Sequence, residues 1–197
     1  RQDRELYVGV DVSLESVAQV REAYGGQANM RAHVADVADA EFVKFQRLGI
    51  DTVFSLNVLE HIEDHLAALR NAAAVLQPGG RLILVVPAHG WLYGSIDRAI
   101  GHHRRYDKEG MAGLIAEVGL TCVYQKYLNA LGALGWLVNG RIRREETPPS
   151  GQLRLFNALV PWIKRVERRV PAPFGISLLA VARKERTAAS GGGENAV

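Results

Sequence analysis

The stretch DTVFSLNVLEHIEDHLAALRNAAAVLQPGGRLILVVP, residues 51–87, decides the fold. Residues 51–56 are rich in β-branched, aromatic and aliphatic side chains, which suit a buried parallel strand. Apolar residues from Leu66 to Leu76 then recur at the spacing of one helical face. Pro78-Gly79-Gly80 is expected to end this helix in a turn, before a second strand over residues 81–86. The stretch therefore predicts one β-α-β unit.

Strands and helices alternate on both sides of this unit. Strands are expected over residues 6–12, 30–34, 120–127 and 176–182, and helices over 14–21, 40–48 and 108–118. Such alternation is typical of an α/β protein with a doubly wound, mostly parallel sheet of the Rossmann-like kind.

The alternation breaks between residues 128 and 173, where we expect a helical insertion or lid. Helices are predicted over 128–142, which carries Trp136, and over 153–170, which is rich in arginine. The insertion could cover the domain's own core or make peripheral contact with a membrane through residues 128–170. Residues 1–186, this insertion included, are expected to form one domain, and residues 187–197 have too little apolar content to order themselves.

Composition narrows the class of protein. The chain has 197 residues, 48% of them apolar, and a formal net charge of +3. The single cysteine, Cys122, cannot form an internal disulfide, which favours a reducing, cytoplasmic location, with the inner face of the membrane as an alternative. Basic residues form no aromatic-interleaved stripe, so nucleic acid is not an expected partner.

Polar residues follow three of the expected strands. Asp11 and Asp36 stand where carboxylates could accept hydrogen bonds from a ribose and an adenine, although each could equally cap a helix or close a turn. Asn57 and His61 lie beyond the Asp51 strand. Asn57 could hold the charged end of a small cofactor. His61 could act as a base or simply cap the next helix.

A cationic and aromatic cluster, HHRRY at residues 102–106, lies in a loop at the same sheet edge. Arg104 and Arg105 could clamp a carboxylate or phosphate, and His102 could take a proton from a hydroxyl. A solvated basic turn is the alternative. No further cysteine or histidine spacing accompanies these histidines, so no metal ion is expected.

Several stretches together resemble the class I S-adenosylmethionine-dependent methyltransferases of the small-molecule branch. They are VGVDVS at 8–13, ADV at 35–37, DTVFSLNVLEHIED at 51–64, LQPGGRLILVVP at 76–87, GHHRRYDKEGMAGLIAEVGL at 101–120 and PFGISLLAVARK at 173–184. The resemblance implies S-adenosyl-L-methionine as cofactor, with Asp11 on the ribose, Asp36 and Val37 at the adenine, and Asn57 at the methionine end. It also implies residues that face the acceptor, namely His61, His89, Asp97, His102, Arg104, Arg105 and Tyr106.

The resemblance further implies a sheet of order 3-2-1-4-5-7-6 with an antiparallel last strand. The family's first strand and its Gly-rich loop should precede the strand that ends at Asp11, yet residues 1–5 cannot supply them. We therefore expect the chain as given to be truncated at its N-terminus, with a slot between the Leu6 and Asp51 strands and half of the cofactor pocket missing.

The implied reaction is methyl transfer to a small-molecule, lipid-linked or glycan-related acceptor, with His102 or His61 as the base. Two other functions stay open. One is a nicotinamide-dependent oxidoreductase on a related sheet, although no Tyr-x-x-x-Lys pair supports it. The other is an inactive or accessory fragment that docks on a membrane or a partner.

Overall fold

The larger sheet of the protein has four strands and contains the central unit. The structure, a computed structural model, describes residues 5–143, 165 and 173–186. The strands β3 (Ile50–Leu56), β4 (Leu76–Pro87), β5 (Thr121–Leu128) and β6 (Ser177–Arg183) lie in the order β3-β4-β6-β5. β3 is parallel to β4, whereas β6 is antiparallel to both of its neighbours. This confirms the expected antiparallel last strand.

A second, smaller sheet pairs β1 (Tyr7–Asp11) with β2 (Met30–Val34) in parallel. Within the described residues β1 and β3 belong to different sheets and share no ladder. The missing first strand, and the slot expected in its place, stay a prediction. α1 (Leu14–Tyr24) connects β1 to β2 and begins at Ser13, whose hydroxyl accepts a hydrogen bond from the Ser16 amide.

An aromatic cluster holds the two sheets together. Phe42 and Phe45, both from the 3₁₀ helix η1 (Ala40–Leu48), meet edge to face with ring centroids 5.2 Å apart. Val8 of β1 and Val53 of β3 pack against this same cluster. Burying apolar surface from both sheets around η1 fixes their relative position without a shared strand ladder.

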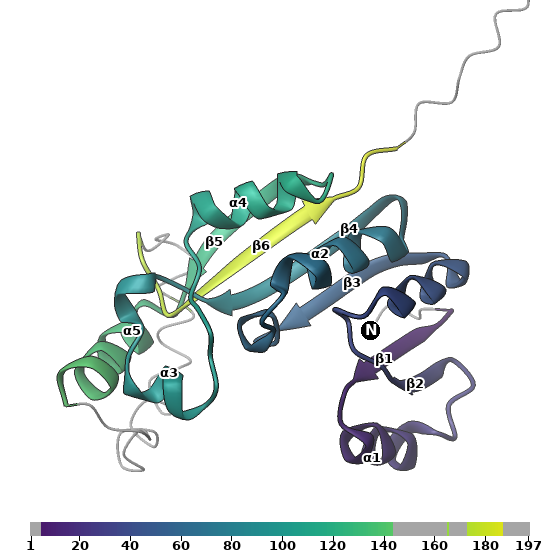
Figure 1. The fold of residues 1–197 in the computed structure, drawn as a ribbon, viewed down its shortest axis with the longest axis horizontal. Coiled ribbons are helices and arrows are strands. Elements are labelled where there is room, and N and C mark those ends of the chain that lie inside the picture. The colour runs from purple at the N-terminus through teal and green to yellow at the C-terminus, as the bar shows by residue number, and fades with distance from the viewer. Residues whose placement is uncertain (1–4, 144–164, 166–172, 187–197) are drawn as a thin grey trace, which may run out of the picture.

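The main core lies on one face of the four-stranded sheet. α2 (His65–Val75) and α4 (Lys108–Glu117) run along this face, as Figure 1 shows. Inward-facing residues of the sheet alternate, as the period of a strand requires. On β4 and β6 they are Leu82, Leu84, Val86, Leu178, Ala180 and Ala182.

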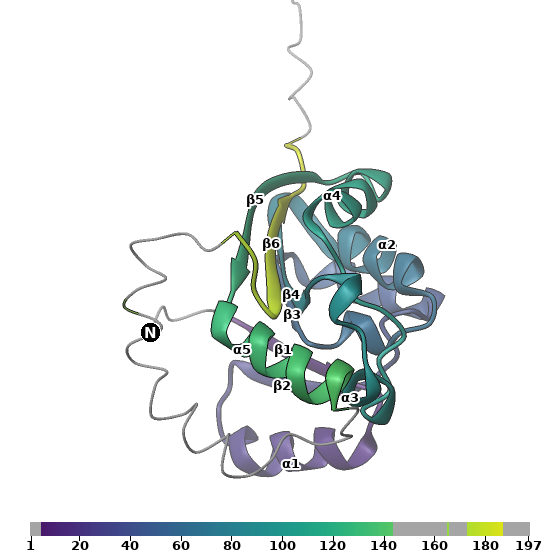
Figure 2. The same ribbon diagram turned by 90° about the vertical axis from the view of Figure 1, so that its left-hand side faces the viewer.

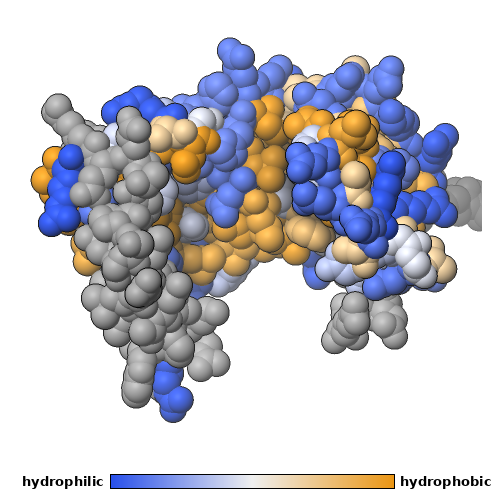
Figure 3. Space-filling view, turned by 90° about the horizontal axis from the view of Figure 1, so that it is seen from below, coloured by the Kyte–Doolittle hydropathy of each residue, from blue (hydrophilic) through white to orange (hydrophobic). Residues whose placement is uncertain are grey.

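The opposite face of the sheet keeps apolar side chains in solvent. Phe54 and Leu56 of β3 are 66% and 54% exposed. Ile83 and Val85 of β4 are only half-buried. Viewed from below, the molecule shows apolar surface across its middle (Figure 3). We refer to these four side chains, Phe54, Leu56, Ile83 and Val85, as the apolar underside.

Two elements differ from the sequence expectation. The chain is already extended at Leu76, which pairs with Ile50, so β4 includes Pro78-Gly79-Gly80 instead of following a turn there. The loop expected after residue 87 contains two short helices, η3 (Gly90–Leu92) and α3 (Ser95–Ala99). Another, η2 (Leu59–His61), follows β3.

The helix expected over residues 128–142 is present as α5 (Ala130–Trp136) and a following π-helical segment, η4 (Leu137–Ile142). Together with α3 it lies beyond the ends of β3 and β4 (Figures 1 and 2). The helix predicted over 153–170 falls almost wholly outside the described residues, and the tail over 187–197 lies outside them. Among the described helices, none has the length and apolar content needed to cross a membrane.

Candidate active site

The site begins at the carboxyl ends of β1 and β2, where Asp11 and Asp36 lie close together. The Ala35 amide donates to the Asp11 carbonyl oxygen over 3.1 Å, which joins the two strand ends. Each carboxylate is exposed and has one oxygen held by a backbone amide, from Ser13 and Ala38 respectively, at 2.8 Å. Among the described residues no hydrogen bond reaches the second oxygen of either group. Both carboxylates are therefore oriented and open, which fits the hydroxyl and amino donors of a nucleoside.

Asn57 stands at the carboxyl end of β3. Its backbone has φ of 52°, in the left-handed region, and its amide donates to the Val85 carbonyl oxygen over 2.8 Å. Its side chain is exposed. Asn57 thus ends β3 at the same side of the molecule to which β1 points (Figure 1). Val37, by contrast, is partly buried and packs against both hydrophobic clusters.

Beyond Asn57, Glu60 and His61 meet His102 of the distant loop. The Glu60 carboxylate is completely buried, and neither of its oxygens has a hydrogen-bond partner among the described residues. Its Oε1 lies 3.7 Å from Nε2 of His102. Burial raises the pKa of the Glu60 carboxyl, against the smaller opposing effects of its own backbone and of His102. The rings of His61 and His102 meet edge to face, with centroids 4.7 Å apart.

Asp97 is the centre of a buried network beneath this group. Its Oδ1 accepts hydrogen bonds from Nδ1 of His102 at 2.9 Å and Nε of Arg105 at 2.7 Å. Its Oδ2 accepts from the Gly94 amide at 2.9 Å and Nε1 of Trp136 at 3.0 Å. Burial alone would raise the pKa of Asp97, but the hydrogen bonds from His102, Arg105 and Trp136 outweigh it and lower the pKa to about 2.

The two arginines of the HHRRY loop bond inside the domain. Arg104 donates to the carbonyl oxygens of Ile62 and Glu63 at 2.7 and 2.9 Å. Arg105, besides Asp97, donates to the Ala88 carbonyl oxygen at 3.0 Å, and its side chain is 1% exposed. Both guanidinium groups therefore fasten this loop to its neighbours. Their expected contact with an acceptor stays a prediction, as does that of the buried Asp97.

Tyr106 is also turned inward. Its hydroxyl donates to the Leu59 carbonyl oxygen at 3.3 Å and accepts from Nδ1 of His65 at 3.0 Å. Tyr106 thereby ties the loop to the start of α2. Its contact with an acceptor likewise stays a prediction.

His89 forms a separate aromatic group at the end of β4. Its ring lies 4.3 Å from Tyr127 and 5.4 Å from Trp91, measured between centroids. Burial lowers the pKa of His89, and the positive charge of Arg105 lowers it further. Trp91 is half exposed, so this group offers an aromatic surface beside the histidine cluster.

α5 joins the site through Trp136, which sequence reasoning had placed only in a lid or membrane helix. The Arg105 guanidinium lies 5.0 Å from the centre of the indole ring, which also donates to Asp97. Ser95 of α3 donates to the Gly140 carbonyl oxygen at 2.9 Å. α5 and η4 therefore pack on the domain itself, as a lid would. Contact of residues 128–170 with a membrane stays a prediction.

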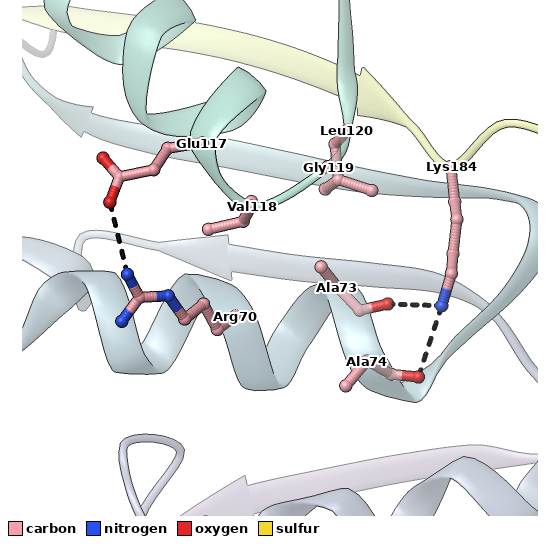
Figure 4. A pocket seen from close by; sticks show the side chains of 8 residues that line it. All are labelled: Arg70, Ala73, Ala74, Glu117, Val118, Gly119, Leu120 and Lys184. Atoms are coloured by element: carbon pink, nitrogen blue, oxygen red, sulfur yellow. Dashed lines mark hydrogen bonds and ion pairs between the residues drawn. The ribbon is translucent and has the colours of Figure 1, made fainter.

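A hollow between α2 and α4 lies far from these groups, at the opposite edge of the sheet. It is lined by Arg70, Glu117 and Lys184 among others (Figure 4). The Lys184 ammonium already donates to the Ala73 and Leu76 carbonyl oxygens, each at 2.8 Å. Arg70, the second cation of the hollow, pairs with Glu117 at 3.2 Å. Since both cations are engaged, we do not assign this hollow a ligand.

The sequence analysis missed Glu60 as a site residue. Its position next to His61 was the one hint of a role in the site. The sequence does not show that His102, 42 residues later, lies beside Glu60 in the fold. The residues brought together are Glu60, His61 and His102. Asp11 and Asp36 form a second group. Asn57 lies at the end of β3, just before Glu60 and His61.

This chain is similar in sequence to known methyltransferases. Residues 1–84 match the family described as "Methyltransferase domain". The 27-O-demethylrifamycin SV methyltransferase of Amycolatopsis mediterranei (strain S699) is 32% identical over 139 residues, which are 64% of this chain and 45% of that protein. The chain thus spans less than half the length of this curated relative.

Solved structures show the same fold. An S-adenosylmethionine-dependent methyltransferase from Mesorhizobium loti aligns with a TM-score of 0.56 and 16% identity, covering 91% of this chain and 81% of that one. The N-methyltransferase NodS from Bradyrhizobium japonicum WM9, in complex with S-adenosyl-L-homocysteine, aligns with a TM-score of 0.52 and 17% identity over 91% and 66%.

Proposed function

We propose that this chain is a class I S-adenosylmethionine-dependent methyltransferase and that it methylates a hydroxyl oxygen of a small molecule. The match of residues 1–84 to a methyltransferase domain and the fold shared with solved methyltransferases support this proposal. The name of the curated relative, an enzyme that acts on 27-O-demethylrifamycin SV, supports an oxygen acceptor. Lipid-linked and glycan-related hydroxyls fall within the same proposal.

Asp11 and Asp36 would hold the nucleoside of the cofactor. Their carboxylates are fixed by the Ser13 and Ala38 amides and keep an oxygen open toward donors. Asn57 would contact the methionine end from β3. When bound, S-adenosylmethionine supplies a methyl group on a sulfonium, which is already activated for displacement. The protein then has to align the acceptor oxygen and take up its proton.

His61 is the residue best placed to take that proton. Its Nδ1 lies 3.2 Å from the Gly101 carbonyl oxygen, which can only accept a hydrogen bond. Nδ1 is therefore the donor in this contact, which leaves Nε2 as the nitrogen that can face an acceptor. The side chain is exposed at the carboxyl end of the sheet, where an acceptor can reach it. An exposed imidazole whose Nδ1 is held by the Gly101 carbonyl oxygen is the observation that supports the proposal.

His102, the other expected base, suits a positioning role better. Its side chain is only 7% exposed, and its two nitrogens face the carboxylates of Asp97 and Glu60. It contacts the His61 ring edge to face. We propose that His102 fixes the orientation of His61 and does not itself meet the acceptor.

The two alternative functions have less support. The relatives described above are methyltransferases, which argues against a nicotinamide-dependent oxidoreductase. Transfer of a labelled methyl group, compared with a change in nicotinamide absorbance, separates these two activities. An accessory fragment would give neither signal.

The experiment is a transfer assay with methyl-labelled cofactor and a panel of hydroxylated small molecules, using the full-length protein. His61→Ala is expected to lower kcat by about 10²–10⁴-fold, the usual effect of losing a general base, with little change in cofactor affinity. His103→Ala is the matched control, because His103 is exposed and is not one of the residues Glu60, His61 and His102 that meet at the site. An undiminished rate in His61→Ala would exclude His61 from the chemistry.

A further inference from the structure

The buried carboxylate of Glu60 has no explanation in the proposed methyl transfer. It is 0% exposed, and both of its oxygens lack a hydrogen-bond partner among the described residues. Leaving a buried carboxyl group unpaired is costly, so native structures usually supply a cation or a donor. Arg105, an arginine of the same network, instead donates to Asp97 and to the Ala88 carbonyl oxygen.

His61 and His102 each have a ring nitrogen near the Glu60 carboxylate. His102 is held by Asp97 through Nδ1 at 2.9 Å, which leaves Nε2 on the side of Glu60, 3.7 Å from Oε1. His61 is held by the Gly101 carbonyl oxygen through Nδ1 at 3.2 Å. One ligand atom from each of Glu60, His61 and His102 lies within 4.8 Å of the others.

This arrangement contains both the ligands of a metal centre and the hydrogen-bond partners that orient such ligands. Histidines that bind metals almost always donate their other ring N–H to a carboxylate or a carbonyl, which fixes the tautomer and the ring orientation. Here Asp97 does this for His102, and Gly101 does it for His61. With Nε2 of each histidine as ligand, and with the Glu60 carboxylate, the site would be a set of two histidines and one carboxylate.

We propose that Glu60, His61 and His102 bind a divalent transition-metal ion of the zinc class. In a tetrahedral zinc site, bonds of about 2.0–2.1 Å place neighbouring ligand atoms roughly 3.3–3.4 Å apart. The 3.7 Å between Glu60 and His102 is close to that value. His61 is exposed and can close the remaining distance by a side-chain rotation, and solvent or an acceptor would complete the coordination on its side.

The site goes beyond the proposed methyl transfer and does not depend on it. A metal ion would bind the same Nε2 atom of His61 that the proposed reaction uses to accept a proton. The two uses therefore exclude each other at any moment. For this reason the site is best tested by metal binding in the absence of cofactor and acceptor.

The experiment is isothermal titration of chelator-treated protein with Zn²⁺, and with Mg²⁺ for comparison. Zn²⁺ is expected to bind at one ion per chain, whereas Mg²⁺, which prefers oxygen ligands, is expected to bind far more weakly. Glu60→Gln and His61→Ala should each weaken Zn²⁺ binding by at least about tenfold. Asp97→Asn should weaken it by about 10–100-fold, the usual effect of losing an outer partner. His103→Ala should leave it unchanged.

Three results would overturn the proposal. One is a protein that shows no saturable Zn²⁺ binding. Another is a Glu60→Gln variant, folded by circular dichroism, that binds Zn²⁺ as tightly as the wild type. In that case His102 would only bridge the carboxylates of Glu60 and Asp97. Equal weakening by His103→Ala would mean adventitious binding by surface histidines, and would also overturn it.

Discussion

Tyr106 makes the stability of the domain depend on pH in the alkaline range. Burial raises the pKa of its hydroxyl to about 12, from an ordinary value near 10. Below pH 10 both folded and unfolded chains keep the phenol neutral, so the contribution is fully present. Between about pH 10 and 12 only the unfolded chain ionises, and roughly 2–3 kcal/mol of stability is lost.

Tyr106→Phe tests this dependence by urea unfolding at pH 8 and pH 11. At pH 8 the variant is expected to be less stable than the wild type by about 1 kcal/mol, because His65 and the Leu59 carbonyl oxygen lose a partner. At pH 11 the difference should shrink or reverse. Tyr24→Phe is the control, since Tyr24 is 44% exposed. A difference that stays constant with pH would contradict the prediction.

Single residues were predictable where their role is local. Asp11 and Asp36 follow strands, and the sequence alone puts such residues at the sheet edge. The partners of Arg105 were not predictable, because Asp97 and Trp136 come from segments 8 residues before it and 31 residues after it. An arginine that binds a ligand and one that binds groups of its own domain cannot be told apart in the sequence.

The carboxyl end of α2 depends on a residue from another element. Lys184, just after β6, donates to the Ala73, Ala74 and Leu76 carbonyl oxygens at 2.8, 3.4 and 2.8 Å (Figure 4 shows the first two). The last carbonyl groups of a helix have no partner within it. Lys184→Met is expected to cost about 2 kcal/mol, in the range of hydrogen bonds to a charged group, and to lower Tm by roughly 4–8 °C.

Differential scanning calorimetry measures this change. Lys44→Met is the control, because the Lys44 side chain is 49% exposed and its ion pair is with Glu41, also on the surface. That variant should lose less than about 1 kcal/mol. If the two variants have the same Tm, the hydrogen bonds from Lys184 to the end of α2 do not stabilise the protein.

Elements with a strong local signal were predicted nearly to the residue. The strand over 30–34 and the helix over 40–48 have the expected bounds, although the latter is a 3₁₀ helix. The predicted start of β4, at residue 81, was wrong. The pairing of Leu76 with Ile50 extends the strand through a Pro-Gly-Gly sequence that otherwise indicates a turn. α3 was missed because five residues carry too little periodicity.

At the scale of the molecule, the order of strands followed from the resemblance to a family and could not come from residue patterns. The patterns gave alternation, but the placement of β6 between β4 and β5 is a non-local pairing. The cluster around Phe42 and Phe45, which joins the two sheets, could not be predicted either, because its members come from four separate elements and the loop after β2.

The apolar underside has a measurable effect on the isolated chain. Phe54→Lys is expected to reduce the fluorescence of a dye that binds apolar surface, and to reduce light scattering in concentrated samples, because the contiguous patch is interrupted. Leu14→Lys, at a similarly exposed apolar residue on α1, is the control and should change neither signal. Equal signals from wild type and Phe54→Lys would contradict the prediction.

The same surface governs how the purified chain should be handled. Attraction between apolar surfaces weakens on cooling and strengthens with sulfate or phosphate salts. Turbidity should therefore develop on warming and clear on chilling, and ammonium sulfate should precipitate this chain at lower concentrations than the Phe54→Lys variant.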